Sequence, residues 1–280
     1  MSDKIIDPHV HFFNLTEGQY TWLQGNTPPA WPNLDKIKAQ TTAAELKAAC
    51  PFQLEALVHI EAGFDNQAPV NELNWLSKHL KSMPYKAISF SAINAPSNQF
   101  IAAMSALEQP QLAGIRDITE GSDSMRLLDP HCQENLAYLA SKHLIFEAQF
   151  EIENQQVTEQ LLHYCRAIPK LQVVINHLGF INNEQNWLGA IIKLSRCDNI
   201  VIKFSGLEFT TLAANKHRWL LDQLLNYFGE HRIMFASNFP VCQINTSYEQ
   251  CWQHYFSLCK QYNVWQLLSF KNARAIYLID

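Results

Sequence analysis

Near its start the chain carries Ile5-Ile6-Asp7-Pro8-His9-Val10-His11, an apolar segment that ends in two histidines. Similar runs of five to eight residues, rich in Ile, Val, Leu and Phe, recur along the chain, each followed by helix-like sequence. The eight runs are residues 4–9, 54–60, 86–93, 112–118, 144–150, 171–175, 200–205 and 232–236. Continuous apolar runs of this length indicate strands buried on both faces. Eight of them alternating with helices predict an α/β fold, a single (β/α)8 TIM barrel.

The intervening segments carry the signals that begin and end helices. Thr42-Ala43-Ala44-Glu45 has the spacing of a capping box, and Asp129-Pro130 suits a helix start. Residues 218–228 have helical apolar spacing and stop at Gly229, and residues 247–262 and 264–278 predict two further helices. An open doubly wound sheet is the alternative, but it needs a glycine-rich turn after the first strand, where this chain has histidines.

Composition narrows the class of protein. The 280 residues are 48% hydrophobic and 17% charged, which suits one domain over residues 1–280 with a large core. The net charge of −5 and the lack of a basic block predict no nucleic-acid or membrane partner. Seven scattered cysteines without a Cys-x-x-Cys pair, and a start unlike a signal peptide, predict reduced thiols and a cytoplasmic location.

One long irregular stretch, residues 12–40, holds Trp22, Trp31 and three prolines. A loop of this length in a compact domain is usually functional, so one interpretation is a lid over the barrel mouth. The other interpretation is an arm that only packs on the surface. Under the first interpretation Trp22 is a candidate substrate contact.

Histidines and an asparagine stand at strand ends, where TIM barrels place their active sites. His9 and His11 lie two residues apart, so they face the same way and could bind one divalent metal, with His177 as a further ligand. Two hydrogen-bonded polar residues at a strand end are the alternative for this pair. His177 ends the sixth run and Asn238 the eighth, and both are candidate catalytic residues.

Other polar residues fall inside or at the ends of the remaining runs. Arg116 is a candidate for catalysis and for binding a substrate carboxylate or a developing oxyanion. The further substrate-binding candidates are His59, Glu61, Gln149 and Lys203. Polar groups this deep in buried strands need partners, so an ion pair between Lys203 and Glu147 is the competing interpretation.

The chain resembles the amidohydrolase-related family of TIM-barrel, metal-dependent hydrolases, which includes sugar lactonases and 2-pyrone-4,6-dicarboxylate lactonases. The resemblance covers nearly the whole chain and rests on these segments taken in order: residues 5–12, Val58-His59-Ile60-Glu61-Ala62-Gly63, Gly114-Ile115-Arg116, Asn176-His177-Leu178-Gly179, residues 202–207, residues 235–241 and Lys271-Asn272-Ala273-Arg274. It implies a small-molecule substrate, metal or substrate contacts for His9 and His11, and a site role for His177.

This chain departs from the family pattern at Asn238, where the family usually has an aspartate that activates water. The fifth run also carries Gln149 where better-known metal amidohydrolases have a histidine. We therefore expect either one divalent, zinc-like metal or none. The leading hypothesis is hydrolysis of a lactone or related cyclic ester. The rivals are a binding barrel that has lost its base and a decarboxylase-type relative.

We also expect a homodimer, packed through an apolar surface helix such as residues 264–278.

Overall fold

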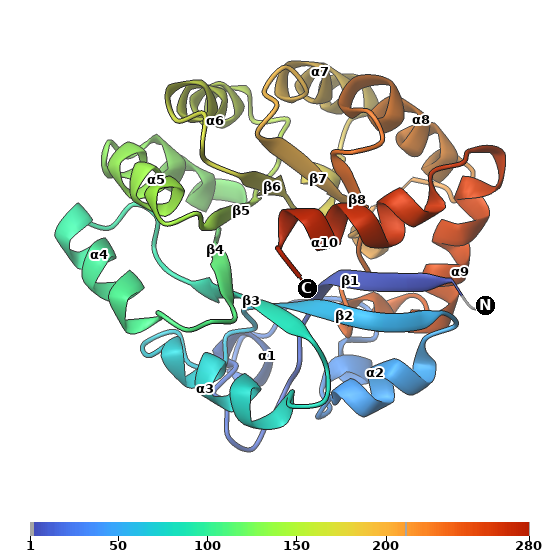
Figure 1. Ribbon diagram of the computed structural model, residues 1–280, viewed down its shortest axis with the longest axis horizontal. Helices are drawn as coiled ribbons and strands as arrows, with labels where there is room; N and C mark the ends of the chain where they lie inside the picture. The colour runs from blue at the N-terminus through green and yellow to red at the C-terminus, as the bar shows by residue number, and fades with distance from the viewer. Residues whose placement is uncertain (1–2, 211, 280) are drawn as a thin grey trace.

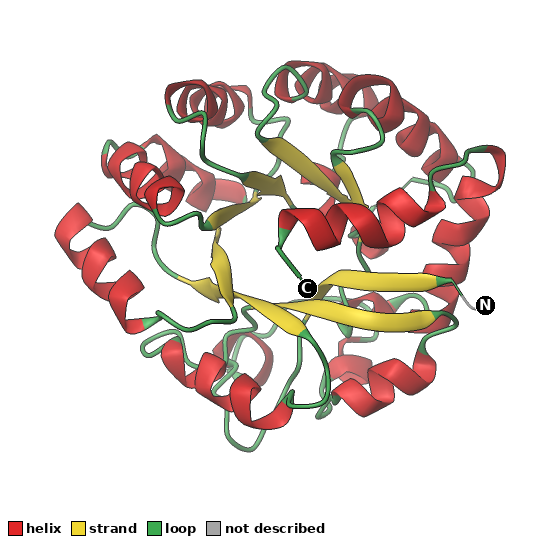
Figure 2. Cartoon of the chain, in the orientation of Figure 1, coloured by secondary structure: helices red, strands yellow, loops and turns green. Residues whose placement is uncertain are grey.

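The computed structural model describes residues 3–210 and 212–279 of the chain. Eight parallel strands follow one another in chain order around a barrel. They are β1 Lys4–Val10, β2 Gln53–Ile60, β3 Tyr85–Phe90, β4 Leu112–Ile118, β5 Ile145–Gln149, β6 Val173–Ile175, β7 Ile200–Phe204 and β8 Ile233–Phe235. A bridge between Val10 and Phe239, with the His11 amide donating to the Phe239 carbonyl at 2.6 Å, joins the last strand to the first. The predicted (β/α)8 barrel is confirmed (Figures 1 and 2).

Helices surround the barrel and connect its strands (Figure 1). The α-helices are α1 Thr21–Gln24, α2 Ala43–Ala49, α3 Val70–His79, α4 Ser97–Ala106, α5 His131–Ser141, α6 Gln155–Ala167, α7 Glu184–Leu194, α8 Lys216–Phe228, α9 Tyr248–Leu258 and α10 Asn272–Ile276. Short 3-10 turns include η1 Leu34–Ile37, η2 Gly121–Leu128, η3 His177–Gly179, η4 Leu207–Phe209 and η5 Val241–Ile244, and a π-helical turn, η7, spans Leu267–Lys271. No helix in the described part of the chain has the length and apolar character to cross a bilayer.

Local signals act largely as the sequence predicts. Thr42 and Glu45 form the capping box of α2, with the Thr42 hydroxyl accepting from the Glu45 amide. Gly229 ends α8 at a φ of 69°, a conformation that favours glycine. The expected N-cap at Asp129 differs, since Pro130 stands at the cap position and Asp129 instead accepts from the His131 amide at 2.9 Å.

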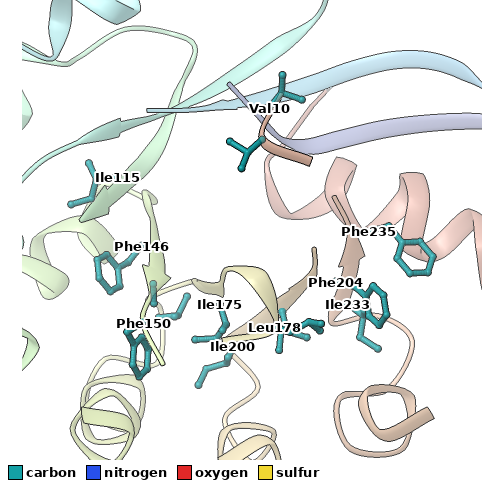
Figure 3. Close-up of a cluster of buried hydrophobic side chains, with 14 of the residues drawn as sticks. Val10, Ile115, Phe146, Phe150, Ile175, Leu178, Ile200, Phe204, Ile233 and Phe235 are labelled. Atoms are coloured by element: carbon teal, nitrogen blue, oxygen red, sulfur yellow. The ribbon is translucent and has the colours of Figure 1, made fainter. Parts of the chain in front are cut away.

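Two layers of apolar side chains hold the barrel. The larger layer lies between the strands and the helices, and Figure 3 shows Phe146, Ile200 and Phe235 of this layer pointing away from the barrel axis. A smaller cluster holds alternate residues of the strands, including Ile6, Val58, Ile88, Val174, Val201 and Met234. Because neighbouring residues of one strand enter different layers, both faces of the sheet are buried, as the continuous apolar runs predict.

The C-terminal segment packs against the barrel instead of offering a free apolar face. In Figure 1, α10 lies across the end of the barrel that faces the viewer. Ala273, Tyr277 and Ile279 join the smaller apolar cluster, and Leu268 is fully buried. The expectation of an apolar surface helix over residues 264–278 is therefore wrong for Leu268, Ala273 and Tyr277, whereas Leu278 of the same segment is exposed. The homodimer itself stays a prediction.

Candidate active site

A cavity of about 410 Å³ opens at the carboxyl ends of the strands. Its polar lining comes from strand ends and includes His11, Glu61, Arg116, Gln149, His177 and Asn238. Its apolar lining includes Trp22, Pro29 and Trp31 of the 12–40 loop and Phe180 and Phe209 of later loops. The loop residues therefore cover part of the mouth, and Trp22 lies where a substrate contact was predicted.

Three imidazoles from two distant parts of the chain meet at this end of the barrel. The ring centroid of His9 lies 4.6 Å from that of His177 and 5.0 Å from that of His11. Burial and nearby cations hold the pKa of each ring well below its usual range. All three are therefore neutral near pH 7, when an imidazole has one N–H donor and one lone pair.

The neutral form of His11 presents a lone pair beside a second acceptor. His11 Nδ1 lies 2.8 Å from the Ile60 carbonyl, which only accepts, so Nδ1 carries the hydrogen and donates it. The unprotonated Nε2 faces Asn238 Oδ1 at 3.3 Å. Two acceptors that face each other cannot hydrogen-bond directly. A molecule with two donor hydrogens, such as water, satisfies both.

The backbone around Asn238 is fixed by a buried carboxylate of the first strand. Asp7 Oδ1 accepts from the Ser237 amide at 3.1 Å, and Asp7 Oδ2 accepts from the Tyr248 hydroxyl at 3.0 Å. Asn238 itself adopts a φ of 60°, a left-handed conformation that asparagine tolerates better than most residues. Its side-chain Nδ2 donates to Glu208 of η4 at 2.5 Å.

His177 has a similarly constrained position. Its φ is 52°, and its Nδ1 lies 3.0 Å from the Ser205 hydroxyl at the end of β7. Gly206 follows at once, and a Cβ there would lie 2.5 Å from the His177 Cβ. Glycine at 206 therefore lets the His177 ring sit against the loop after β7. Non-glycine residues in strained backbone conformations cluster at functional sites.

Arg116 lines the cavity, but its guanidinium is already occupied. Nε and NH2 both contact Glu61 Oε1, at 2.8 and 2.7 Å, and NH2 also donates to the Glu61 carbonyl at 2.8 Å. NH1 donates to Gln149 Oε1 at 2.7 Å and lies 3.5 Å from His9 Nε2. Glu61 and Gln149 therefore take up most of the five N–H donors, and the remaining NH1 hydrogen is turned toward His9 and not toward the cavity mouth.

Lys203 and His59, two predicted substrate contacts, lie behind the cavity. Lys203 is fully buried and donates to both oxygens of Glu147, at 2.8 and 2.6 Å, which confirms the predicted ion pair. His59 is held by the Phe12 amide on Nδ1 and by Glu72 on Nε2, the latter at 2.9 Å. Neither side chain lines the cavity, because its polar atoms are committed to partners inside the protein.

The side chains around His9 do not suit a divalent metal. Lys203 Nζ lies 3.3 Å from His9 Nδ1, and Arg116 NH1 lies 3.5 Å from Nε2, so both ring nitrogens face a cation. Asn238 adds no negative charge. In the described residues, no three His, Cys, Asp or Glu side chains come together as a metal site requires.

Glu208 is the functional candidate that the sequence analysis missed. It stands three residues after Ser205, in a loop of low sequence regularity, and its partner Asn238 is 30 positions away. A carboxylate just beyond a barrel strand is the one signal that could have found it. Glu120, which accepts from Gln149 Nε2 at 2.6 Å at the cavity edge, was also missed.

Comparison with known proteins agrees with this architecture. The sequence profile of the amidohydrolase family matches residues 6–277. An L-fucono-1,5-lactonase of Burkholderia multivorans is 23% identical over 264 residues, covering 88% of this chain and 85% of the relative. An L-rhamnono-gamma-lactonase of Scheffersomyces stipitis is 19% identical over 307 residues, covering 92% and 91%.

Solved structures show the same fold. The crystal structure of an amidohydrolase from Burkholderia multivorans with bound zinc superposes with a TM-score of 0.80 at 18% identity, covering 99% of both chains. The profile match over almost the whole length, together with the closed eight-stranded barrel, establishes that this chain belongs to the amidohydrolase family and is a hydrolase of that superfamily.

Proposed function

We propose that the protein hydrolyses a neutral, hydroxyl-bearing lactone of the sugar-lactone class at the barrel mouth. The observation that carries the proposal is the pair of acceptors at the cavity, His11 Nε2 and Asn238 Oδ1, 3.3 Å apart. A water that lies beside these two atoms, on their cavity side, donates one hydrogen to each and turns its oxygen lone pairs toward a bound carbonyl carbon. The names of the two lactonase relatives support the reaction class.

The reaction then follows from the proton positions. The water oxygen bonds to the lactone carbonyl carbon while His11 Nε2 takes the water proton as general base. Asn238 cannot take a proton and only orients the water. When the tetrahedral intermediate collapses, the carbon–oxygen bond of the ring breaks, and the departing alkoxide receives the proton from His11. The product is an open-chain hydroxy acid.

His177 is suited to stabilise the developing oxyanion. We propose that the Ser205 hydroxyl, 3.0 Å from Nδ1, donates to that nitrogen, which leaves the hydrogen of the neutral ring on Nε2; His177 lines the cavity. A donor aimed at the charge that develops in the transition state lowers the barrier more in a buried site than in water. The positive charge of buried Arg116 also stabilises the developing oxyanion electrostatically, although its guanidinium does not bond to the substrate.

The lining favours a neutral ring over a carboxylated one. The Arg116 guanidinium is held by Glu61 and Gln149 and is not free to bind a substrate carboxylate. The Trp31 ring lies 5.8 Å from that of Trp22 and 5.0 Å from that of Phe209, which gives an aromatic wall for the apolar face of a sugar ring. Glu61 and Glu120 offer carboxyl oxygens to substrate hydroxyl groups.

Metal removal should leave this activity unchanged. Because both nitrogens of His9 face cations, we propose that the protein works without a resident metal. Dialysis against a chelator should change kcat by less than twofold, with the metal content of the same sample measured by elemental analysis. A loss of activity on chelation that added zinc restores would contradict a metal-independent site.

The proposed function is tested with a panel of neutral sugar lactones and one dicarboxylated pyrone, followed by acid release. We expect turnover of at least one neutral lactone and a fall of roughly 10²- to 10³-fold in kcat for His177→Ala, the effect of losing an oxyanion donor. Binding of lactones without turnover would instead favour a ligand-binding barrel. Turnover of the pyrone alone would contradict the substrate class.

A further inference from the structure

We propose that Glu208 is a positioning residue that fixes the Asn238 carboxamide with its oxygen toward His11 and the cavity, so that the Glu208–Asn238 pair replaces a single carboxylate at the end of β8. The inference rests on the proposed function in one respect, that Asn238 orients the attacking water.

The orientation of the amide follows from hydrogen-bond chemistry. An ionised carboxylate only accepts, and Glu208 Oε1 lies 2.5 Å from the terminal atom of Asn238, so that atom must be the donor Nδ2. The amide oxygen then points the other way, to His11 Nε2 at 3.3 Å. If the amide were turned by 180°, Oδ1 would face the Glu208 carboxylate, and two acceptors would be in contact. Nδ2 would then face the cavity, where the attacking water needs an acceptor.

The surroundings of Glu208 offer no other reason for a charge there. No lysine or arginine among the described residues forms an ion pair with it, and Asn245 contacts only its backbone carbonyl, at 2.8 Å. Burial raises the pKa of the Cys242 thiol of η5 and of the Cys251 thiol and Tyr255 phenol of α9, and the charge of Glu208 raises the pKa of each further. All three therefore stay neutral.

A buried carboxylate with one side-chain partner costs stability, and a neutral glutamine could occupy the same volume. The effect of the Glu208 charge on the Asn238 amide explains why a carboxylate, and not a neutral side chain, stands at this position. The carboxylate polarises the Asn238 amide and strengthens Oδ1 as an acceptor, as expected in a chain of hydrogen bonds at low dielectric.

A pH dependence follows from the same contact. Burial raises the pKa of Glu208 to about 7. Below that pH the protonated carboxyl can donate to Oδ1, so the amide is free to turn its Nδ2 toward His11. Above it, only the productive orientation satisfies the carboxylate. The rate constant kcat should therefore rise with pH through a midpoint near 7.

The kinetic test compares three variants on the best lactone. Glu208→Gln should lower kcat roughly 10- to 100-fold, the scale of misplacing a reacting group, with KM within twofold, and should remove the rise near pH 7. Asn238→Asp places two carboxyls in contact that must share a proton. The double variant Glu208→Gln/Asn238→Asp restores a donor–acceptor pair and should recover at least tenfold over Glu208→Gln. Glu249→Gln, at an exposed glutamate that accepts from Gln253 at 2.9 Å, is the matched control and should leave kcat unchanged.

A second measurement needs no turnover. In 15N-labelled protein, the Asn238 side-chain amide signals, identified by their loss in Asn238→Asp, should shift with a midpoint near pH 7, and the shift should vanish in Glu208→Gln. Signals that do not titrate in the unmodified protein, or a double variant no faster than Glu208→Gln, would overturn the inference. Titrating signals in a protein that hydrolyses no lactone would leave the inference standing and reject the proposed function.

Discussion

Replacing His11 with alanine is expected to lower kcat for lactone hydrolysis by roughly 10³-fold, within the range for loss of a general base. The Ile60 carbonyl, 2.8 Å from Nδ1, fixes the ring so that its Nε2 lone pair faces Asn238 and the cavity. KM should change little, because the ring contacts the water and not the lactone hydroxyls. Initial rates over a range of lactone concentrations separate the two constants.

His231→Ala, which removes a histidine whose side chain is 75% exposed, is the control for this variant and should retain full activity. Circular dichroism spectra of both variants check that the barrel persists. A His11→Ala protein that kept more than a tenth of the original kcat would show that another group accepts the proton, and the proposed mechanism would fail.

Replacing Lys203 with methionine is expected to lower the free energy of unfolding by about 3–5 kcal/mol, the cost of leaving a buried charge without its partner. Lys203 and Glu147 are both fully buried, and Lys203 donates to both carboxylate oxygens. Tyr277 also donates to Glu147 Oε1, so the pair ties the C-terminal helix to the centre of the barrel. Urea unfolding at pH 7 gives the free energy.

The paired variant Lys203→Met/Glu147→Gln removes both charges, and its amide oxygen still accepts from the Tyr277 hydroxyl. It should recover most of the lost free energy, since neutral replacements of buried ion pairs are often tolerated. If the double variant were as unstable as Lys203→Met alone, the loss would come from packing and not from the stranded carboxylate.

The sequence predicted the barrel because its signals are local. Each strand is a continuous apolar run, so eight runs and the order of elements could be counted without knowing any tertiary contact. The same count placed His9 and His177 at one end of the barrel, where their rings lie 4.6 Å apart. Strand position and side-chain alternation determine these features, and both can be read from one sequence.

Pairing between distant loops could not be predicted in the same way. Glu72 was not expected to hold His59, nor Glu208 to hold Asn238, because each contact joins a strand end to a residue in a later or earlier connection. These side-chain contacts determine which polar groups point into the cavity and which point away from it. His59 was therefore assigned to the cavity although Glu72 holds it behind the cavity, whereas for Lys203 the competing interpretation, an ion pair with Glu147, is the one that the structure shows.

The C-terminal segment shows a related limit. Its apolar residues, among them Leu268 and Tyr277, have the pattern of a face that packs against something, but the pattern does not say against what. This segment itself covers the end of the barrel, so Leu268, Ala273 and Tyr277 are inside the molecule, while Leu278 stays exposed.

The most direct test of the central claim is a crystal structure with a lactam analogue of the best lactone, which keeps the ring and carbonyl but resists hydrolysis. We predict a water that contacts both His11 Nε2 and Asn238 Oδ1 and lies about 3–3.5 Å from the carbonyl carbon, with the carbonyl oxygen toward His177 Nε2. An analogue bound with its carbonyl away from His11 and His177, or coordinated to a metal, would contradict the account.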